Sequence, residues 1–86
     1  MSKPLRVLFV EDSEDDAESI ARELRRGGFE PTYERVDTQA AFQAALEWKT
    51  WDVIIADYTL PRFNGLMALG MARETGLDIP FILVPG

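Results

Sequence analysis

Short apolar runs alternate with helical patterns along the sequence, and this alternation is the feature that most limits the possible folds. Residues 5–10 and 53–56 are nearly continuous apolar runs of strand formers, as found in parallel strands buried on both faces. Weaker runs at 31–36 and 79–84 indicate two more strands, with Pro80 near a strand start, where a missing N–H is tolerated. The predicted order along the chain is therefore βαβαβαβ.

The segments between these runs carry helical spacing together with signals for where helices begin and end. Ser13 is a capping residue for the first helix, and Asp37 or Thr38 can cap the second. Trp48 is expected on the apolar stripe of the second helix, and Gly76 is expected to end the third. Each helix would connect two parallel strands that are consecutive along the chain.

These elements predict an α/β fold in which a doubly wound, right-handed parallel sheet carries helices on both faces. A strand order of 2-1-3-4 would place the first and third strands side by side. The chain is 47% hydrophobic and 28% charged, which indicates one globular domain over residues 1–86.

Composition removes several kinds of chemistry. The sequence contains no cysteine and no histidine, so disulfides, thiolate or imidazole metal sites and histidine general bases are excluded. The net charge of −6 argues against nucleic acid as a direct partner. The apolar run at residues 5–10 is too short for a signal segment or a membrane span, so we expect no membrane partner and a cytoplasmic location.

Acidic residues follow two of the predicted strands. Glu11 and Asp12 come directly after the first strand, and Asp57 ends the third. Ligands of open α/β sheets bind beyond the carboxyl ends of the strands, where these carboxylates would converge. A hard divalent cation such as Mg²⁺ would relieve their repulsion and leave room for a phosphate. The alternative is that these carboxylates are solvated loop residues or helix caps.

The residues around these carboxylates resemble those of a known family. Residues 7–13 (VLFVEDS) and 57–65 (DYTLPRFNG) are similar to two characteristic segments of response-regulator receiver domains, which have a flavodoxin-like fold. The resemblance implies that Asp57 accepts a phosphoryl group from a histidine kinase or a phosphotransfer protein. It also implies a Mg²⁺ cofactor bound by Asp12, by Asp57, by the backbone carbonyl of Thr59 and, through water, by Glu11. At most, such a domain catalyses its own phosphorylation and dephosphorylation.

The sequence also departs from the family pattern. Pro85 stands near the position at which the family has a Ser or Thr, and the Lys that pairs with the phosphoryl group is not found at a matching position. We therefore expect an incomplete, four-stranded receiver that lacks the fourth helix, fifth strand and fifth helix. Its open fourth strand and uncovered sheet face predict self-association into a homo-oligomer.

Two functions remain open at this stage. The first is a phosphoacceptor module of a two-component phosphorelay, in which charge at Asp57 biases a surface toward or away from a partner. The second is a receiver-derived fragment that does not signal and acts as a self-associating structural module. A dependence on Mg²⁺ would distinguish the first function from the second.

Overall fold

The chain forms a four-stranded parallel sheet with helices on both faces, in a computed structural model that describes residues 2–85. The strand order is β2-β1-β3-β4, and the flavodoxin-like fold with order 2-1-3-4 is therefore confirmed. The elements are β1 (Lys3–Val10), α1 (Glu14–Arg26), β2 (Phe29–Val36), α2 (Gln39–Trp48), β3 (Val53–Asp57), α3 (Gly65–Glu74) and β4 (Phe81–Val84).

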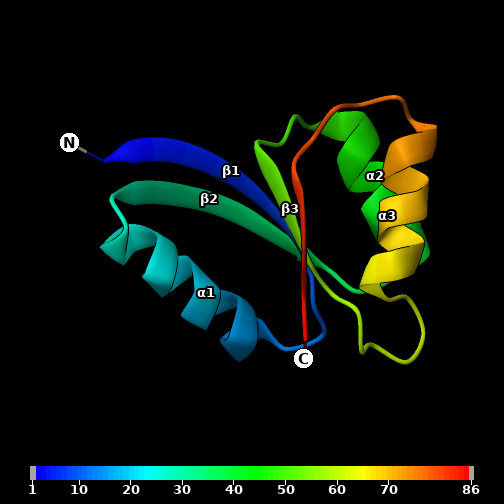
Figure 1. Cartoon of the computed structure of the whole chain (residues 1–86), viewed down its shortest axis with the longest axis horizontal. Helices are drawn as coiled ribbons and strands as arrows, with labels where there is room; N and C mark the ends of the chain where they lie inside the picture. The colour runs from blue at the N-terminus through cyan, green and yellow to red at the C-terminus, as the bar shows by residue number, and fades with distance from the viewer. Residues whose placement is uncertain (1, 86) are drawn as a thin grey trace.

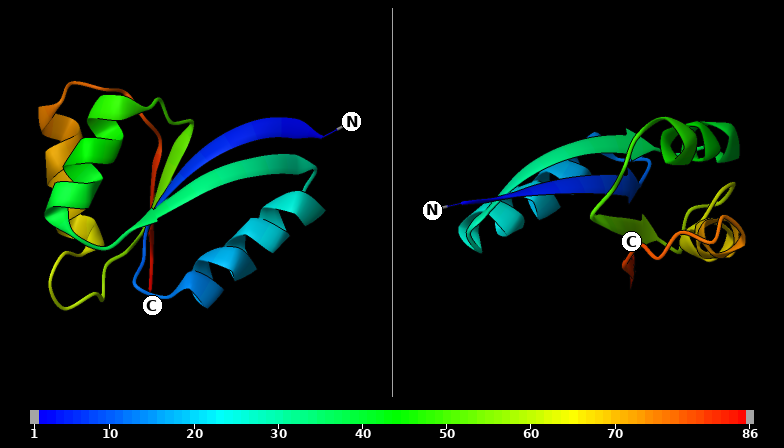
Figure 2. Two further views of the ribbon diagram at one scale, coloured as in Figure 1. Left: turned by 180° about the vertical axis from the view of Figure 1, so that it is seen from behind. Right: turned by 90° about the horizontal axis from the view of Figure 1, so that it is seen from above.

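The helices form two layers around the sheet (Figure 1). Helix α1 lies on one face, and α2 and α3 lie together on the other, as the view from above also shows (Figure 2). The last four residues of β1, from Val7 to Val10, are fully buried because helices cover both of their faces. This burial explains why the run in the sequence is continuously apolar rather than alternating.

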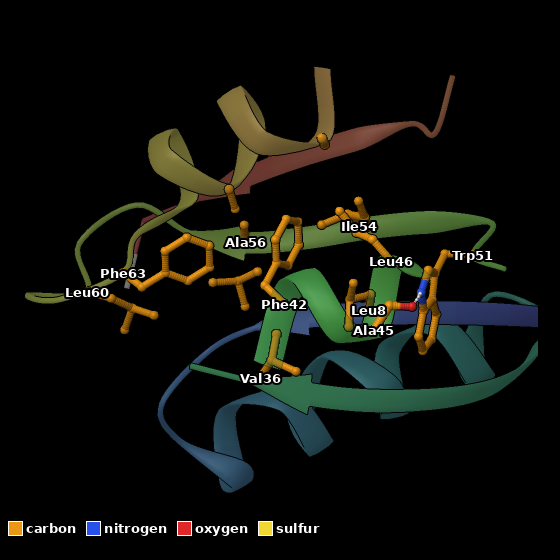
Figure 3. Close-up of a cluster of buried hydrophobic side chains, with 13 residues drawn as sticks. Leu8, Val36, Phe42, Ala45, Leu46, Trp51, Ile54, Ala56, Leu60 and Phe63 are labelled. Carbon is orange, nitrogen blue, oxygen red and sulfur yellow. Dashed lines mark hydrogen bonds between the residues drawn. The ribbon is translucent and has the colours of Figure 1, made fainter. Parts of the chain in front are cut away.

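Each face of the sheet has its own hydrophobic cluster. The larger cluster lies under α2 and α3, where the rings of Phe42 and Phe63 pack 5.5 Å apart between centroids (Figure 3). The smaller cluster lies under α1 and contains Phe9, Ala17 and Ile55. Alternate residues of one strand therefore belong to different clusters, as the two-residue period of a strand requires.

Side-chain caps begin all three helices just beyond strand ends. The Ser13 hydroxyl accepts a hydrogen bond from the Asp16 N–H at 3.2 Å, and the Thr38 hydroxyl accepts one from the Ala41 N–H at 3.1 Å. The Asn64 side-chain carbonyl caps α3 in the same way. Of the two predicted caps for the second helix, Thr38 is the one used.

Trp48 departs from the prediction. It is 83% exposed, whereas Trp51 is buried and its indole N–H donates to the Ala45 carbonyl at 3.0 Å. Trp48 is the last residue of α2, and the buried stripe of that helix is formed by Phe42, Ala45 and Leu46. The interpretation of Trp48 as a buried stripe residue was therefore wrong. Leu66 of α3 is likewise 61% exposed, because α3 turns Ala68 and Ala72 toward the sheet.

Candidate acidic site at the strand ends

The sheet register brings the predicted acidic residues to one edge. Val10 pairs with Ala56, so Glu11 and Asp57 come next on neighbouring strands at the same level. Both lie two positions beyond residues of the cluster under α1, Phe9 and Ile55, and two positions preserve the face of a strand. Glu11 and Asp57 therefore lie on the α1 side of the sheet, and the loops after β1 and β3 meet at one end of the molecule (Figure 1).

Asp57 is held by the loop that follows it. Its side chain is buried, and its Oδ1 accepts two hydrogen bonds from Thr59: one from the backbone N–H at 2.8 Å and one from the hydroxyl at 2.6 Å. Within residues 2–85, Asp57 Oδ2 accepts no hydrogen bond. Every side-chain oxygen that is buried in this part of the chain does have a hydrogen-bond partner, so Oδ2 is not among the buried oxygens. The Oδ2 atom of Asp57 therefore reaches the surface, and among the described residues it is the carboxylate oxygen of Asp57 without a hydrogen-bond partner.

Glu11 is almost as buried as Asp57, and its environment opposes ionisation. Burial, followed by the neighbouring carboxyl of Asp12 and the negative charges of Asp57 and Asp16, raises the pKa of Glu11 to about 6. The Ser13 N–H donates to Glu11 Oε1 at 3.1 Å and offsets part of this rise. Crowding of carboxyl groups is thus present at this edge of the sheet.

The residues at the site suit a hard cation, although they do not form a complete cage. Asp12 and Thr59 are exposed beside the buried Glu11 and Asp57. Within residues 2–85, no three acidic side chains come together as a ready-made metal cluster. Mg²⁺ needs few protein ligands because it keeps several of its waters, and crowded carboxylates favour a cation. The metal-ligand set of Glu11, Asp12, Asp57 and the Thr59 carbonyl stays a prediction.

Arg35 is a residue at the site that the sequence reasoning missed. It is the penultimate residue of β2, and its Nη1 donates to the backbone carbonyl of Glu11 at 3.2 Å. The available signal in the sequence was a basic residue at the carboxyl end of a strand, which is the end where ligands of such sheets bind.

The end of β4 lies beside Asp57. Asp57 pairs with Val84, and the Tyr58 N–H donates to the Val84 carbonyl at 3.2 Å. Pro85 follows directly and has neither a backbone N–H nor a side-chain hydroxyl to offer. The neighbouring strand therefore provides no hydrogen-bond donor at the position of Pro85.

Two surface hollows lie elsewhere. The larger, about 690 Å³, is lined by the end of α2 and by the segments that precede β3 and β4, including Trp48, Thr50 and Asp78. The smaller, about 450 Å³, lies between α2 and α3 and is lined by residues such as Gln43 and Met71. Neither includes an acidic residue of the candidate site, so size alone does not locate the chemistry.

Fold and site together define a doubly wound α/β domain with a carboxylate site at the strand ends, and comparison with known proteins shows which proteins it is similar to. No protein-family model matches the chain. The response regulator MprA of Mycolicibacterium vanbaalenii is 28% identical over 81 residues, which cover 94% of this chain and 34% of MprA. The transcriptional regulatory protein DltR of Streptococcus agalactiae is 32% identical over 83 residues, which cover 93% of this chain and 35% of DltR.

Solved structures give the same answer for the fold. The MaeR response regulator bound to beryllium trifluoride matches with a TM-score of 0.79 and 23% identity, over 100% of this chain and 68% of MaeR. Full-length FixJ from B. japonicum matches with a TM-score of 0.74 and 20% identity, over 96% of this chain and 39% of FixJ. In sequence and in fold the chain is similar to response regulators, and it spans about a third of the length of MprA and DltR.

Proposed function

We propose that this chain is a phosphoacceptor module of a two-component phosphorelay in which Asp57 receives a phosphoryl group from a histidine kinase or a phosphotransfer protein. The observation that carries the proposal is the state of the Asp57 carboxylate. Oδ1 is fixed by two donors from Thr59, while Oδ2 has no partner and reaches the surface. One oxygen is therefore held for orientation, and the other is available as a nucleophile.

The transfer would exchange one bond to phosphorus for another. Asp57 Oδ2 attacks the phosphorus atom of the donor phosphoimidazole, a P–O bond forms, and the P–N bond breaks. The electron pair of that bond leaves with the imidazole nitrogen of the donor protein. The orientation of Asp57 by Thr59 keeps Oδ2 directed outward, so that the attacking and leaving atoms can lie in line.

The chain's own residues would hold a cation close to the transferred group. Glu11, Asp12, Asp57 and the Thr59 carbonyl are the proposed ligands, and their fit rests on the crowding that raises the pKa of Glu11 to about 6. Mg²⁺, when bound, supplies positive charge that neutralises the phosphoryl oxygens. The phosphoryl donor would act at the exposed end of the sheet, and we propose that it does so in the cytoplasm. Within residues 2–85, no helix has the length and apolar character needed to cross a membrane.

The comparisons support this proposal in a limited way. The MaeR neighbour holds beryllium trifluoride, a mimic of a phosphoryl group, but the likeness to MaeR concerns the fold. The names of MprA and DltR place them in regulation, and their partners are proposed for this chain only by analogy. Any catalysis by this chain would be limited to self-phosphorylation and dephosphorylation at Asp57.

The experiment is phosphorylation with acetyl phosphate, followed by intact mass in the presence of Mg²⁺ or of EDTA. We expect an adduct of one phosphoryl group in the wild-type chain with Mg²⁺. The adduct should be absent with EDTA and absent from Asp57→Asn. Asp12→Asn should raise the Mg²⁺ concentration needed to form the adduct. Asp15→Asn, a change of an exposed acidic residue on α1, serves as the control and should behave as wild type.

A second function is favoured by one specific observation, the departure at the end of β4. Pro85 lies beside Asp57 without a donor, so a phosphoryl group there would lack the hydroxyl that relays the switch in the family pattern. In this alternative the chain is a self-associating structural module that does not signal. Absence of the adduct from a folded wild-type chain would favour it over the phosphoacceptor.

A further inference from the structure

Arg35 shares the face and the edge of the sheet on which Glu11 and Asp57 lie. In the register of the sheet, Phe9 of β1 pairs with Arg35 of β2 on one side and with Ile55 of β3 on the other. These three residues therefore lie on one face, the α1 side, and Glu11 and Asp57 follow two positions later on that same face. Arg35 therefore lies level with Phe9, two positions before Glu11, and on the strand next to β1.

The contacts of Arg35 tie it to the acidic loop rather than to a single carboxylate. Nη1 donates to the Glu11 carbonyl at 3.2 Å, and the nearest carboxylate oxygen, on Asp37, lies 3.9 Å away. A guanidinium has five N–H donors, and within residues 2–85 this hydrogen bond uses one of them. The side chain is 32% exposed, so part of the guanidinium-bearing side chain remains accessible beside the Glu11 carbonyl that it contacts.

Several other basic residues are paired at a distance from this site. Arg6 pairs with Asp52, Arg25 with Glu18, and Lys49 with Glu34. Asp52 precedes β3, Glu34 lies within β2, and Glu18 lies on α1, where it also accepts a hydrogen bond from Tyr33 of β2. Arg35 is the basic residue that contacts the backbone of the acidic loop itself.

A phosphoryl group on Asp57 would add about −1.5 to −2 charges beside carboxyl groups that already repel one another. From this geometry we infer that Arg35 is a positioning residue for the anionic state of the site. It holds the Glu11 carbonyl, which orients the loop after β1, and its charge stabilises the phosphoryl group on Asp57. The inference rests on the proposed phosphoacceptor function and assigns a cationic role at this site to Arg35 of β2.

The test compares an anion and a cation at the same site. Bound beryllofluoride, the phosphoryl mimic, is measured by ¹⁹F NMR at saturating Mg²⁺, and Mg²⁺ alone is measured by calorimetry. We expect Arg35→Gln to weaken beryllofluoride about fivefold, as fits one partly exposed charge, and to leave Mg²⁺ affinity equal or higher. Arg35→Lys keeps the charge and should recover affinity to within about twofold of wild type. Arg22→Gln, the same charge change at an exposed position of α1, should leave both affinities unchanged.

Each other outcome has a definite meaning. Equal beryllofluoride affinity in wild type and Arg35→Gln overturns the inference and leaves the phosphoacceptor function standing. Equal weakening of beryllofluoride and Mg²⁺ also overturns it, because a loosened loop would affect cation and anion alike. If the wild-type chain with Mg²⁺ binds no beryllofluoride at all, the phosphoacceptor function fails and the inference fails with it. Circular dichroism confirms that each variant is folded, and Arg35→Lys carries the comparison if Arg35→Gln does not fold.

Discussion

Thr59 donates both its backbone N–H and its hydroxyl to the same oxygen of Asp57, at 2.8 and 2.6 Å. The two bonds close a tight turn directly after β3 and leave the other Asp57 oxygen free. A residue two positions beyond the proposed phosphoacceptor thus sets the orientation of the Asp57 carboxylate.

Replacing Thr59 by Val should remove the hydroxyl donor while keeping the shape of the side chain. We expect a loss of about 1 kcal/mol in the free energy of unfolding, the usual size for one hydrogen bond to a charged acceptor that is partly screened. Thr59→Ser retains the donor and is the matched control. Urea unfolding of both variants measures the difference, and equal stability of Thr59→Val and wild type would show that the backbone N–H alone holds Asp57.

Glu11 should make stability depend on pH in metal-free buffer. Its pKa is raised from 4.5 to about 6, so the folded state favours the protonated carboxyl. The contribution of protonated Glu11 to the free energy of unfolding is fully present below pH 4.5 and is lost as the pH rises through 6. The full loss is about 2 kcal/mol. The Gln side chain in Glu11→Gln can still accept a hydrogen bond from the Ser13 N–H but does not titrate. The free energy of unfolding of this variant should therefore not show this decrease with pH.

The measurement is urea unfolding in EDTA at pH 4.5, 6 and 7.5, reported as the difference between wild type and Glu11→Gln. Subtraction removes the opposite trend of Asp52 and Glu18, whose pKa values are lowered by hydrogen bonds from Arg6 and Tyr33 respectively. A difference that does not change with pH would contradict a raised pKa for Glu11.

Gly65 should be required by packing at the start of α3. A Cβ added there would lie 2.5 Å from Leu83 Cδ2 and 3.2 Å from Ala56 Cβ, which is too close for either. Leu83 can move, but Ala56 is in the buried strand β3, so we expect Gly65→Ala to cost about 1 kcal/mol. Gly70→Ala in the same helix meets nothing within 4 Å and should stabilise by about 0.5–1 kcal/mol. Thermal unfolding compares the two, and a stabilising Gly65→Ala would refute the close approach.

The 86-residue chain by itself should self-associate through β4. In this chain β4 has a neighbour on one side, and its Ile82 is 49% exposed. Ile82→Lys should shift the chain toward monomer, because a charged side chain opposes edge pairing and burial. Leu77→Lys is the matched control, because Leu77 is also 49% exposed but precedes the strand. Sedimentation velocity measures the distribution, and a monomeric wild type would contradict this expectation.

Much of the fold followed from local pattern. The buried run from Val7 to Val10 and the caps at Ser13 and Thr38 are local in sequence, and the structure confirmed the strand and the helix starts. The boundaries shifted where pairing decided them: β2 begins at Phe29 because it pairs with Lys3 along the whole of β1. Trp48 was misassigned because helical spacing does not reveal which residues at the end of a helix other side chains cover.

The sequence by itself determined which residues could carry chemistry and that they follow strands, because strand runs and turn signals depend on near neighbours in the chain. Tertiary structure alone decided what those residues do to one another. The raised pKa of Glu11, the free oxygen of Asp57 and the contact of Arg35 with the Glu11 carbonyl all require strands β2, β1 and β3 to lie side by side. Burial and charge act through space, and residues far apart in the chain become neighbours only once the sheet has formed.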